Sequence, residues 1–181
     1  TYVAVAQFKT LETDLTMSQI KAIWRGTSES LPSDRQPAFT RIAILLEDAT
    51  PLKALLGQPA STVEFVSSFD GLNEAAKDVR PTLLIVPFAK LIPSWTVLAI
   101  NRQKPIENTN NYRESAYPLR VTYYLSWQGF GRHDQQTLDA LIGSIPSTDR
   151  DPAKLTVVAM TGVTAMVRDT ADQMDRYGSL W

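Results

Sequence analysis

Hydrophobic and polar positions along this chain alternate between patterns that are typical of strands and of helices. Uninterrupted apolar runs rich in Val, Ile and Leu are typical of strands buried on both faces. Such runs occur at Tyr2–Phe8, Arg41–Leu46, Thr82–Val86 and Thr96–Ile100, with a shorter strand predicted at Val63–Val66. The segment Leu119–Trp127 alternates and carries aromatic residues, which also favours a strand.

Helices are predicted where polar capping residues precede an amphipathic pattern. Thr16 and Gln19 have the spacing of a capping box, and they open a helix through Trp24 that Gly26 ends. Further helices are predicted at Thr50–Gly57, with Thr50 as its cap, at Asp70–Asp78 and at Asp134–Ile142. The asparagine-rich segment Asn101–Ala116 is predicted to be a loop.

Strands that alternate with short helices predict an α/β fold. We therefore expect a mixed, mainly parallel sheet flanked by helices, with right-handed crossovers between its parallel strands.

The end of the chain predicts a second unit. Leu155–Gly178 reads as a buried strand, a glycine turn and a helix, yet the sequence stops at Trp181. We expect an α/β domain over residues 1–147, a linker rich in proline and aspartate over 148–154, and the truncated opening of a following domain over 155–181. This organisation, with Thr1 in place of a starting Met, suggests a piece of a longer polypeptide.

Composition excludes several chemistries. The chain has 18 basic and 19 acidic residues with neither sign clustered, so no basic stripe indicates nucleic-acid binding. The absence of cysteine removes disulfides, thiolate metal sites and cysteine nucleophiles. No apolar run is long enough to cross a bilayer. The pattern predicts neither a metal site nor a cofactor in this segment.

Two predicted strand-to-helix junctions carry candidate ligand contacts. Asp48 and Thr50 follow the strand at Arg41–Leu46, and Ser67 and Ser68 follow the strand at Val63–Val66. Loops at such junctions line ligand clefts in open α/β sheets. Two adjacent carboxylates, Glu47 and Asp48, should repel anions there, so a hydroxyl-rich, amine or cationic ligand fits better than phosphate. The alternative is that these residues only cap helices.

An aromatic residue after the third buried strand gives a further candidate. Trp95 could stack on a sugar or a polymer backbone if it is exposed, or it could be half-buried packing.

Three other features have a simpler explanation than a functional one. His133 is the single histidine and is interpreted as a solvated loop residue before a helix. The Thr161-Gly162 turn lacks the further glycines and the lysine of a phosphate loop. Arg168 is a possible anion contact, although a salt bridge to Asp172 is the simpler idea.

Several segments of the chain follow one another in a familiar order, namely the strand from Val3, the helix Leu15-Thr-Met-Ser-Gln-Ile-Lys-Ala-Ile-Trp-Arg-Gly26, the strand-loop-helix Arg41–Gly57, Leu84-Ile-Val-Pro-Phe88 and Tyr117-Pro-Leu119. Together they resemble the second lobe of type 2 periplasmic binding proteins, in particular their phosphate-binding branch. In phosphate binders the loop that matches Glu47–Thr50 typically reads serine-glycine-threonine, whereas here it is acidic. The resemblance implies a bacterial, extracytoplasmic protein of the cell envelope.

A second stretch, Thr156-Val-Val-Ala-Met-Thr-Gly-Val-Thr-Ala-Met-Val-Arg168, is similar to the opening of the catalytic domain of CapA-type poly-γ-glutamate capsule proteins. Some members of that family carry a binding-protein-like region ahead of it. The resemblance implies a ligand-recognition module of capsule synthesis, with the membrane-associated capsule machinery and the following domain as partners.

Three functions follow from these observations. The first is a non-catalytic module that binds a small solute or an envelope polymer through Asp48, Thr50, Ser67, Ser68 and Trp95. The second is the front part of a CapA-like metal-dependent phosphoesterase-type hydrolase whose catalytic residues lie beyond Trp181. The third is a structural spacer that binds nothing small.

Overall fold

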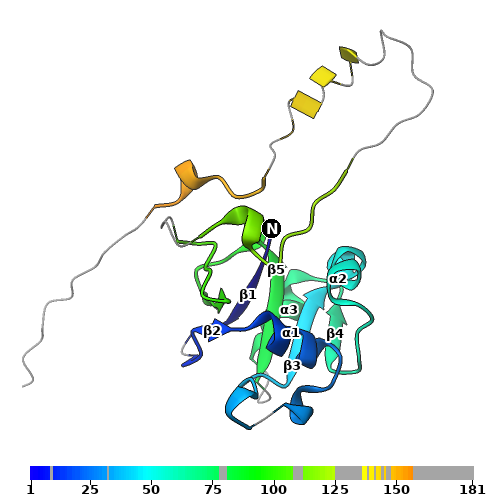
Figure 1. Ribbon diagram of the computed structural model, residues 1–181, viewed down its shortest axis with the longest axis vertical. Helices are drawn as coiled ribbons and strands as arrows, with labels where there is room; N and C mark the ends of the chain where they lie inside the picture. Colours follow the sequence, from blue (N-terminus) through cyan, green and yellow to red (C-terminus); the bar gives the residue numbers. More distant parts are fainter. Residues whose placement is uncertain are drawn as a thin grey trace, which may run out of the picture.

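The apolar runs of the sequence form a five-stranded sheet with the order β4-β3-β5-β1-β6 (Figure 1). The computed structural model describes residues 1–8, 10–31, 33–77, 81–107, 112–124, 136–137, 139–140, 142–143, 145 and 148–156. The strands of this sheet are β1 (Tyr2–Gln7), β3 (Arg41–Leu45), β4 (Val63–Val66), β5 (Thr82–Pro87) and β6 (Trp95–Val97).

The sheet is mixed and mainly parallel, as the sequence predicts. β3 is parallel to both β4 and β5, whereas β1 is antiparallel to β5 and β6. Four strands therefore run in one direction and β1 runs against them. The first residue of β1, Tyr2, thus pairs with the last residue of β5, Pro87. This places Tyr2 at the edge where the parallel strands end.

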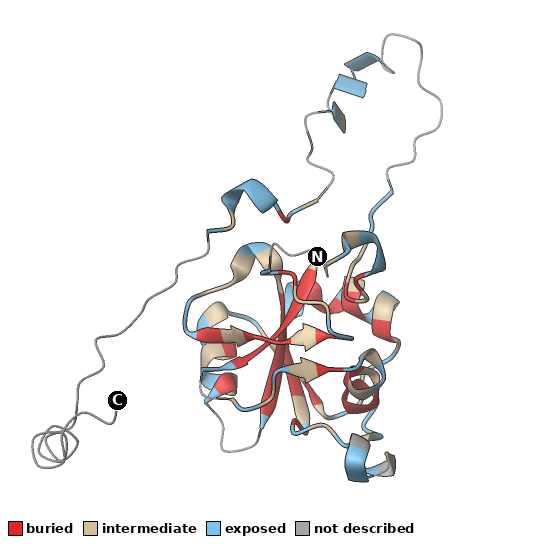
Figure 2. Ribbon diagram, turned by 60° about the vertical axis from the view of Figure 1, so that its left-hand side comes forward, coloured by how far each residue is buried: buried red, intermediate tan, exposed pale blue. Residues whose placement is uncertain are grey.

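Helices cover both faces of the sheet, and each face has its own apolar cluster. α1 (Met17–Trp24) and α2 (Ala49–Leu56) pack on the face that carries Ile42, Ile44 and Ile85. α3 (Phe69–Ala76) packs on the opposite face against Val3, Val5 and Leu84. Figure 2 shows the central strands buried between these layers. The run of apolar residues in each strand follows from this burial on both sides.

The ends of the helices follow local signals. Thr16 and Gln19 form the predicted capping box, in which Gln19 N donates to Thr16 Oγ1 at 3.2 Å and Thr16 N donates to Gln19 Oε1 at 2.7 Å. Gly57 ends α2 with a φ of 92°, which favours glycine. Trp24 is fully buried and its Nε1 donates to the Gly57 carbonyl at 2.8 Å, so α1 is tied to the end of α2.

Two strand predictions are corrected by the structure. The predicted strand Thr96–Ile100 is two short strands, β6 and β7 (Ala99–Ile100), because the chain leaves the main sheet after Leu98 and β7 pairs with β2 (Asp14–Leu15). The predicted strand Leu119–Trp127 is wrong for 119–124, which form no strand. Leu119 is fully buried, whereas Tyr123 and Tyr124 are 74% and 87% exposed, so this segment leaves the core instead of pairing in it.

The remaining predictions concern the end of the chain. Residues 136–137, 139–140 and 142–143, at the predicted helix Asp134–Ile142, are helical. Residues 148–156 include a short 3₁₀ turn at Pro152–Lys154. The strand-turn-helix predicted for 155–181 lies, apart from its first two residues, outside the described part, so the division into domains stays a prediction.

Candidate functional site

A polar cluster lies where the parallel strands of the main sheet end, and Asp48 is its centre. A 3₁₀ turn at Leu46–Asp48 joins β3 to α2 and turns the two adjacent carboxylates in different directions. Glu47 is exposed and pairs with Lys90, which follows β5. Asp48 is only 7% exposed, and its Oδ1 accepts a hydrogen bond of 2.9 Å from the Tyr2 hydroxyl.

The second oxygen of this carboxylate is buried and unsatisfied. Asp48 Oδ2 has no hydrogen-bond partner among the described residues. An unsatisfied buried acceptor is costly in a folded protein, so each one needs an explanation. A ligand group that donates a hydrogen bond would satisfy it.

Burial also changes the protonation of this pair. Burial raises the pKa of Asp48 above its ordinary value, and Glu47 contributes in the same direction, while the Tyr2 hydrogen bond and Lys90 oppose the rise. Burial and the neighbouring Asp48 raise the pKa of Tyr2, so its phenol remains a hydrogen-bond donor. Perturbed titratable groups of this kind gather at functional sites.

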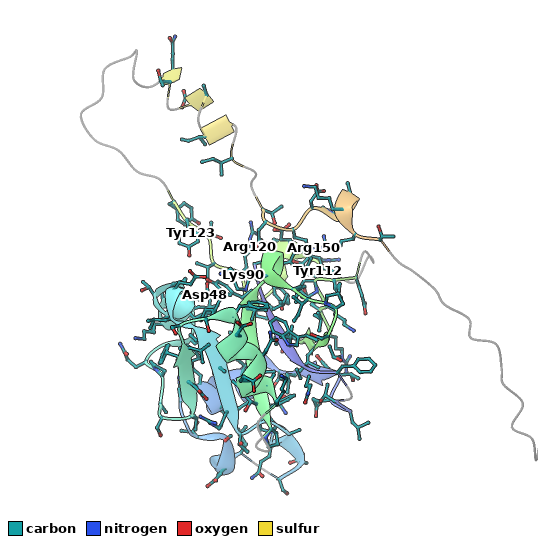
Figure 3. All side chains as sticks on the ribbon, turned by 180° about the vertical axis from the view of Figure 1, so that it is seen from behind. Asp48, Lys90, Tyr112, Arg120, Tyr123 and Arg150 are labelled. Atoms are coloured by element: carbon teal, nitrogen blue, oxygen red, sulfur yellow. The ribbon has the colours of Figure 1, made fainter. Side chains whose placement is uncertain are left out.

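A second polar group lies at the same end of the domain, in the segment 112–120 and around Arg150. Figure 3 shows Asp48, Lys90, Tyr123, Arg120 and Arg150 together at this end of the sheet. The Tyr112 hydroxyl, the Tyr117 hydroxyl and Glu114 Oε1 are buried without a hydrogen-bond partner among the described residues. Burial raises the pKa of Tyr112 and of Tyr117. These phenols therefore stay neutral donors.

A strap at residues 148–156 returns to this polar group and is held by Arg150. Arg150 is 4% exposed, its Nε donates to the Pro105 carbonyl at 2.6 Å, and its guanidinium lies 4.4 Å from the centre of the Tyr112 ring. Its Nη2 donates to the Glu107 carbonyl at 2.9 Å. A planar guanidinium can make these contacts at once, which a lysine cannot.

Four of the five predicted site residues lie at this edge. Asp48 is buried as described, and Thr50 is exposed inside α2. Ser67 and Ser68 are exposed after β4, the neighbour of β3. The prediction that Asp48 and Thr50 cap α2 is wrong, because α2 begins at Ala49 and no side chain caps it. The prediction of a cap at Ser68 is confirmed, since Ser68 Oγ accepts from Gly71 N at 3.1 Å.

The fifth residue, Trp95, lies at the other edge. It pairs with Gln7, the last residue of β1, and so lies where the parallel strands begin. It is 7% exposed and its ring centre is 5.1 Å from that of Phe69, so it packs in the core instead of presenting a stacking surface. It also borders a separate cavity of about 910 Å³ at that edge. The prediction that Trp95 lies at the same edge of the sheet as the other four residues is therefore wrong.

The sequence reasoning missed Tyr2, Lys90, Glu114 and Arg120. Lys90 follows a buried strand, as Asp48 does, and that position could have identified it. Tyr2 is the first residue of its strand, and it lies at this edge only because β1 runs antiparallel to its neighbours. The residues His133, Gly162 and Arg168 lie outside the described part of the chain.

The described residues hold no group of three or more His, Cys, Asp or Glu side chains that could bind a metal ion. None of their helices is both long and apolar enough to pass through a membrane.

Comparisons with known proteins show the fold. No protein-family model and no curated protein matches the sequence. The structure is similar to an ABC-type phosphate transport receptor from Vibrio cholerae, with a TM-score of 0.59 and 14% identity over 79% of this chain and 63% of the receptor. The chain therefore spans less than two thirds of that receptor. This domain has a periplasmic-binding-protein-like α/β fold.

A second solved structure is more distant. It is a phosphate ABC transporter substrate-binding protein with bound phosphate from Clostridium perfringens, with a TM-score of 0.43 and 10% identity over 56% of this chain and 45% of that one. This likeness is too weak to support an argument.

Proposed function

We propose that the domain is a solute-recognition lobe of an extracytoplasmic binding protein of the bacterial cell envelope. The fold supports a binding role, because ligands of open α/β sheets bind beyond the carboxyl ends of the strands. The observation that carries the proposal is the buried Asp48 carboxylate at that edge, whose Oδ2 has no partner among the described residues. Thr50, Ser67 and Ser68, which are exposed and follow β3 and β4 at the same edge, are proposed as further contacts.

The charged groups at this edge determine which hydrogen-bonding groups and which charge the solute needs. A free acceptor at Asp48 needs a hydrogen-bond donor on the ligand. Glu47 lies beside it, and its ion pair with Lys90 leaves the immediate surroundings of Asp48 without a net positive charge. A hydroxyl-rich, amine or protonated ligand fits these groups better than a fully deprotonated anion. Phosphate, which the name of the similar receptor from Vibrio cholerae gives as its solute, is therefore a candidate only in a protonated form.

A capsule-related role is the finer form of this proposal. It depends on the segment Thr156–Arg168, of which the structure describes only Thr156. Poly-γ-glutamate therefore belongs among the ligands to be tested, and the enzyme alternative depends on sequence beyond Trp181.

Calorimetric titration of the whole chain tests the proposal. The titrants are phosphate, sorbitol, putrescine, the dipeptide Leu-Leu and poly-γ-glutamate, each against wild type, Asp48→Asn and Glu74→Gln. Glu74 is a matched control, since its exposed carboxylate lies on α3 and pairs only with Lys77 among the described residues. We expect at least one titrant to bind, with about 10-fold weaker affinity in Asp48→Asn and unchanged affinity in Glu74→Gln. No binding by any titrant, or equal binding by Asp48→Asn, would contradict the proposal.

A further inference from the structure

A cavity of about 810 Å³ opens beside Tyr2, at the same edge of the sheet as Asp48. Its wall includes Tyr2, whose hydroxyl donates to Asp48, so Tyr2 lies between the cavity and the polar cluster. A volume of this size is in the range that encloses a whole small-molecule ligand. The cavity therefore enlarges the candidate site beyond the surroundings of Asp48.

Two side chains of opposite charge line this cavity and lack a partner. Glu114 contributes a buried carboxylate oxygen, Oε1, with no hydrogen-bond partner in the described part of the chain. Arg120 is half-buried, and no hydrogen bond or ion pair engages its guanidinium among the described residues. Asp149 also lines the cavity, and its Oδ1 accepts a hydrogen bond of 2.8 Å from Thr1 N. Glu114 and Arg120 are thus an acid and a base of this wall without a side-chain partner in the described part of the chain.

The rest of the wall is mainly apolar and aromatic. Tyr123 and Tyr124 present largely exposed rings, and Val121, Ile142 and Ile145 add aliphatic surface. A bare phosphate ion would engage Arg120, but it would leave Glu114 opposite an anion and most of this wall uncovered. A polyol would cover more of the wall but would leave the guanidinium without an anion.

We infer that the cavity takes a zwitterionic solute of the amino-acid or short-peptide class. Its ammonium group binds Glu114, its carboxylate binds Arg120, and its apolar body lies against Tyr123 and Tyr124. This inference rests on the proposed binding function and names the class of its ligand. Charge-assisted hydrogen bonds of this kind are the stronger ones in proteins, and the guanidinium fork matches a carboxylate.

Blocked peptides test this assignment on the wild-type chain. The probes are Leu-Leu, N-acetyl-Leu-Leu, which lacks the ammonium group, and Leu-Leu amide, which lacks the carboxylate. We expect Leu-Leu to bind the whole chain about 10-fold or more tightly than either blocked form. Equal binding of all three peptides would overturn the inference. No variant is needed at this stage, so misfolding cannot obscure the result.

Two variants then assign each charge to its residue. In Glu114→Gln, Leu-Leu and N-acetyl-Leu-Leu should bind equally, while Leu-Leu amide remains weaker. In Arg120→Gln, Leu-Leu and Leu-Leu amide should bind equally, while N-acetyl-Leu-Leu remains weaker. Glu74→Gln and Lys154→Gln, at exposed positions outside the cavity, serve as controls and should behave as wild type. Loss of discrimination at the opposite end of the peptide would overturn the assignment.

Failure of this inference can be told apart from failure of the proposed function. If phosphate, sorbitol or putrescine binds in an Asp48-dependent manner and Leu-Leu does not, the zwitterion assignment is wrong and the binding function stands. If no titrant binds the folded wild-type chain, both are wrong.

Discussion

At the scale of single residues, the adjacent carboxylates of Glu47 and Asp48 have different surroundings at the edge of the sheet. Glu47 faces solvent and pairs with Lys90, whereas Asp48 turns inward to Tyr2. A carboxylate thus serves as a solvated ion at one position and as a buried acceptor at the next. Burial raises the pKa of Asp48, and this gives the protein a pH dependence that a neutral residue would lack.

The sign of this dependence follows from which state binds the proton more tightly. The pKa of Asp48 in the folded protein lies above its ordinary value of 3.8. At a pH between these two values, unfolding therefore releases the Asp48 proton. The stability contributed by Asp48 is therefore complete below that value and is lost as the pH rises through the raised pKa. Asp48→Asn carries no such proton and keeps an oxygen that can accept from Tyr2.

We therefore expect Asp48→Asn to gain stability relative to wild type as the pH rises from about 3 to 7. Urea unfolding at a series of pH values measures the difference in free energy of unfolding between the two proteins. Glu74→Gln, at an exposed site, should show no such trend. If the free energy of unfolding of wild type instead rises relative to that of Asp48→Asn as the pH increases, the Asp48 carboxylate is stabilised in its charged form.

At the scale of elements, two strand-to-helix junctions look alike in sequence but are built differently. After β4, the Ser68 side chain caps α3 through Gly71 N. After β3, a 3₁₀ turn intervenes, α2 begins without a side-chain cap, and Thr50 lies exposed within the helix. A hydroxyl residue near the start of a helix is therefore not by itself evidence of a cap.

Alanine substitutions distinguish the two junctions. Ser68→Ala should lower the free energy of unfolding by about 1 kcal/mol, because the first turn of α3 loses its acceptor. Thr50→Ala should change it by less than about 0.5 kcal/mol, because an exposed helical side chain without a cap contact is lost. Urea unfolding of both variants provides the comparison. A larger loss in Thr50→Ala than in Ser68→Ala would contradict the observed capping.

At the scale of the whole molecule, Arg150 joins segments that are far apart in sequence. It brings the strap at 148–156 against the loop carrying Pro105 and Glu107 and against Tyr112. This closes one side of the cavity, because Thr148 and Asp149 line its wall. The segment predicted as a linker therefore includes a residue that is packed in the domain, although its role as a boundary between domains stays a prediction.

Removing this guanidinium should destabilise the domain. In Arg150→Leu two backbone carbonyls lose their buried donor, and we expect the free energy of unfolding to fall by about 2–4 kcal/mol. Arg150→Lys should recover only part of this, because an ammonium group cannot span both carbonyls and stack on a ring. Lys154→Leu, at a side chain that is 84% exposed, is the control. Wild-type stability of Arg150→Leu in urea would show that the strap does not contribute to the fold.

The sequence by itself determined the local structure. Apolar runs identified the core of β1, β3 and β5 because a strand buried on both faces favours a nearly continuous run of apolar residues. Capping residues and glycines identified the ends of α1 and the end of α2, because these signals act within one turn of a helix. The acidic junction after β3 was identified in the same way, which led to Asp48.

Only the tertiary structure decided which residues meet. The direction of β1 brings Tyr2 to Asp48, and the register of β6 against β1 places Trp95 at the far edge. Glu114 and Arg120 meet at the cavity wall because their segment packs beside the start of β1, where Tyr2 N donates to the Leu119 carbonyl. Strand direction and loop packing are set by contacts between distant segments, and the periodicity within one segment does not identify its partner.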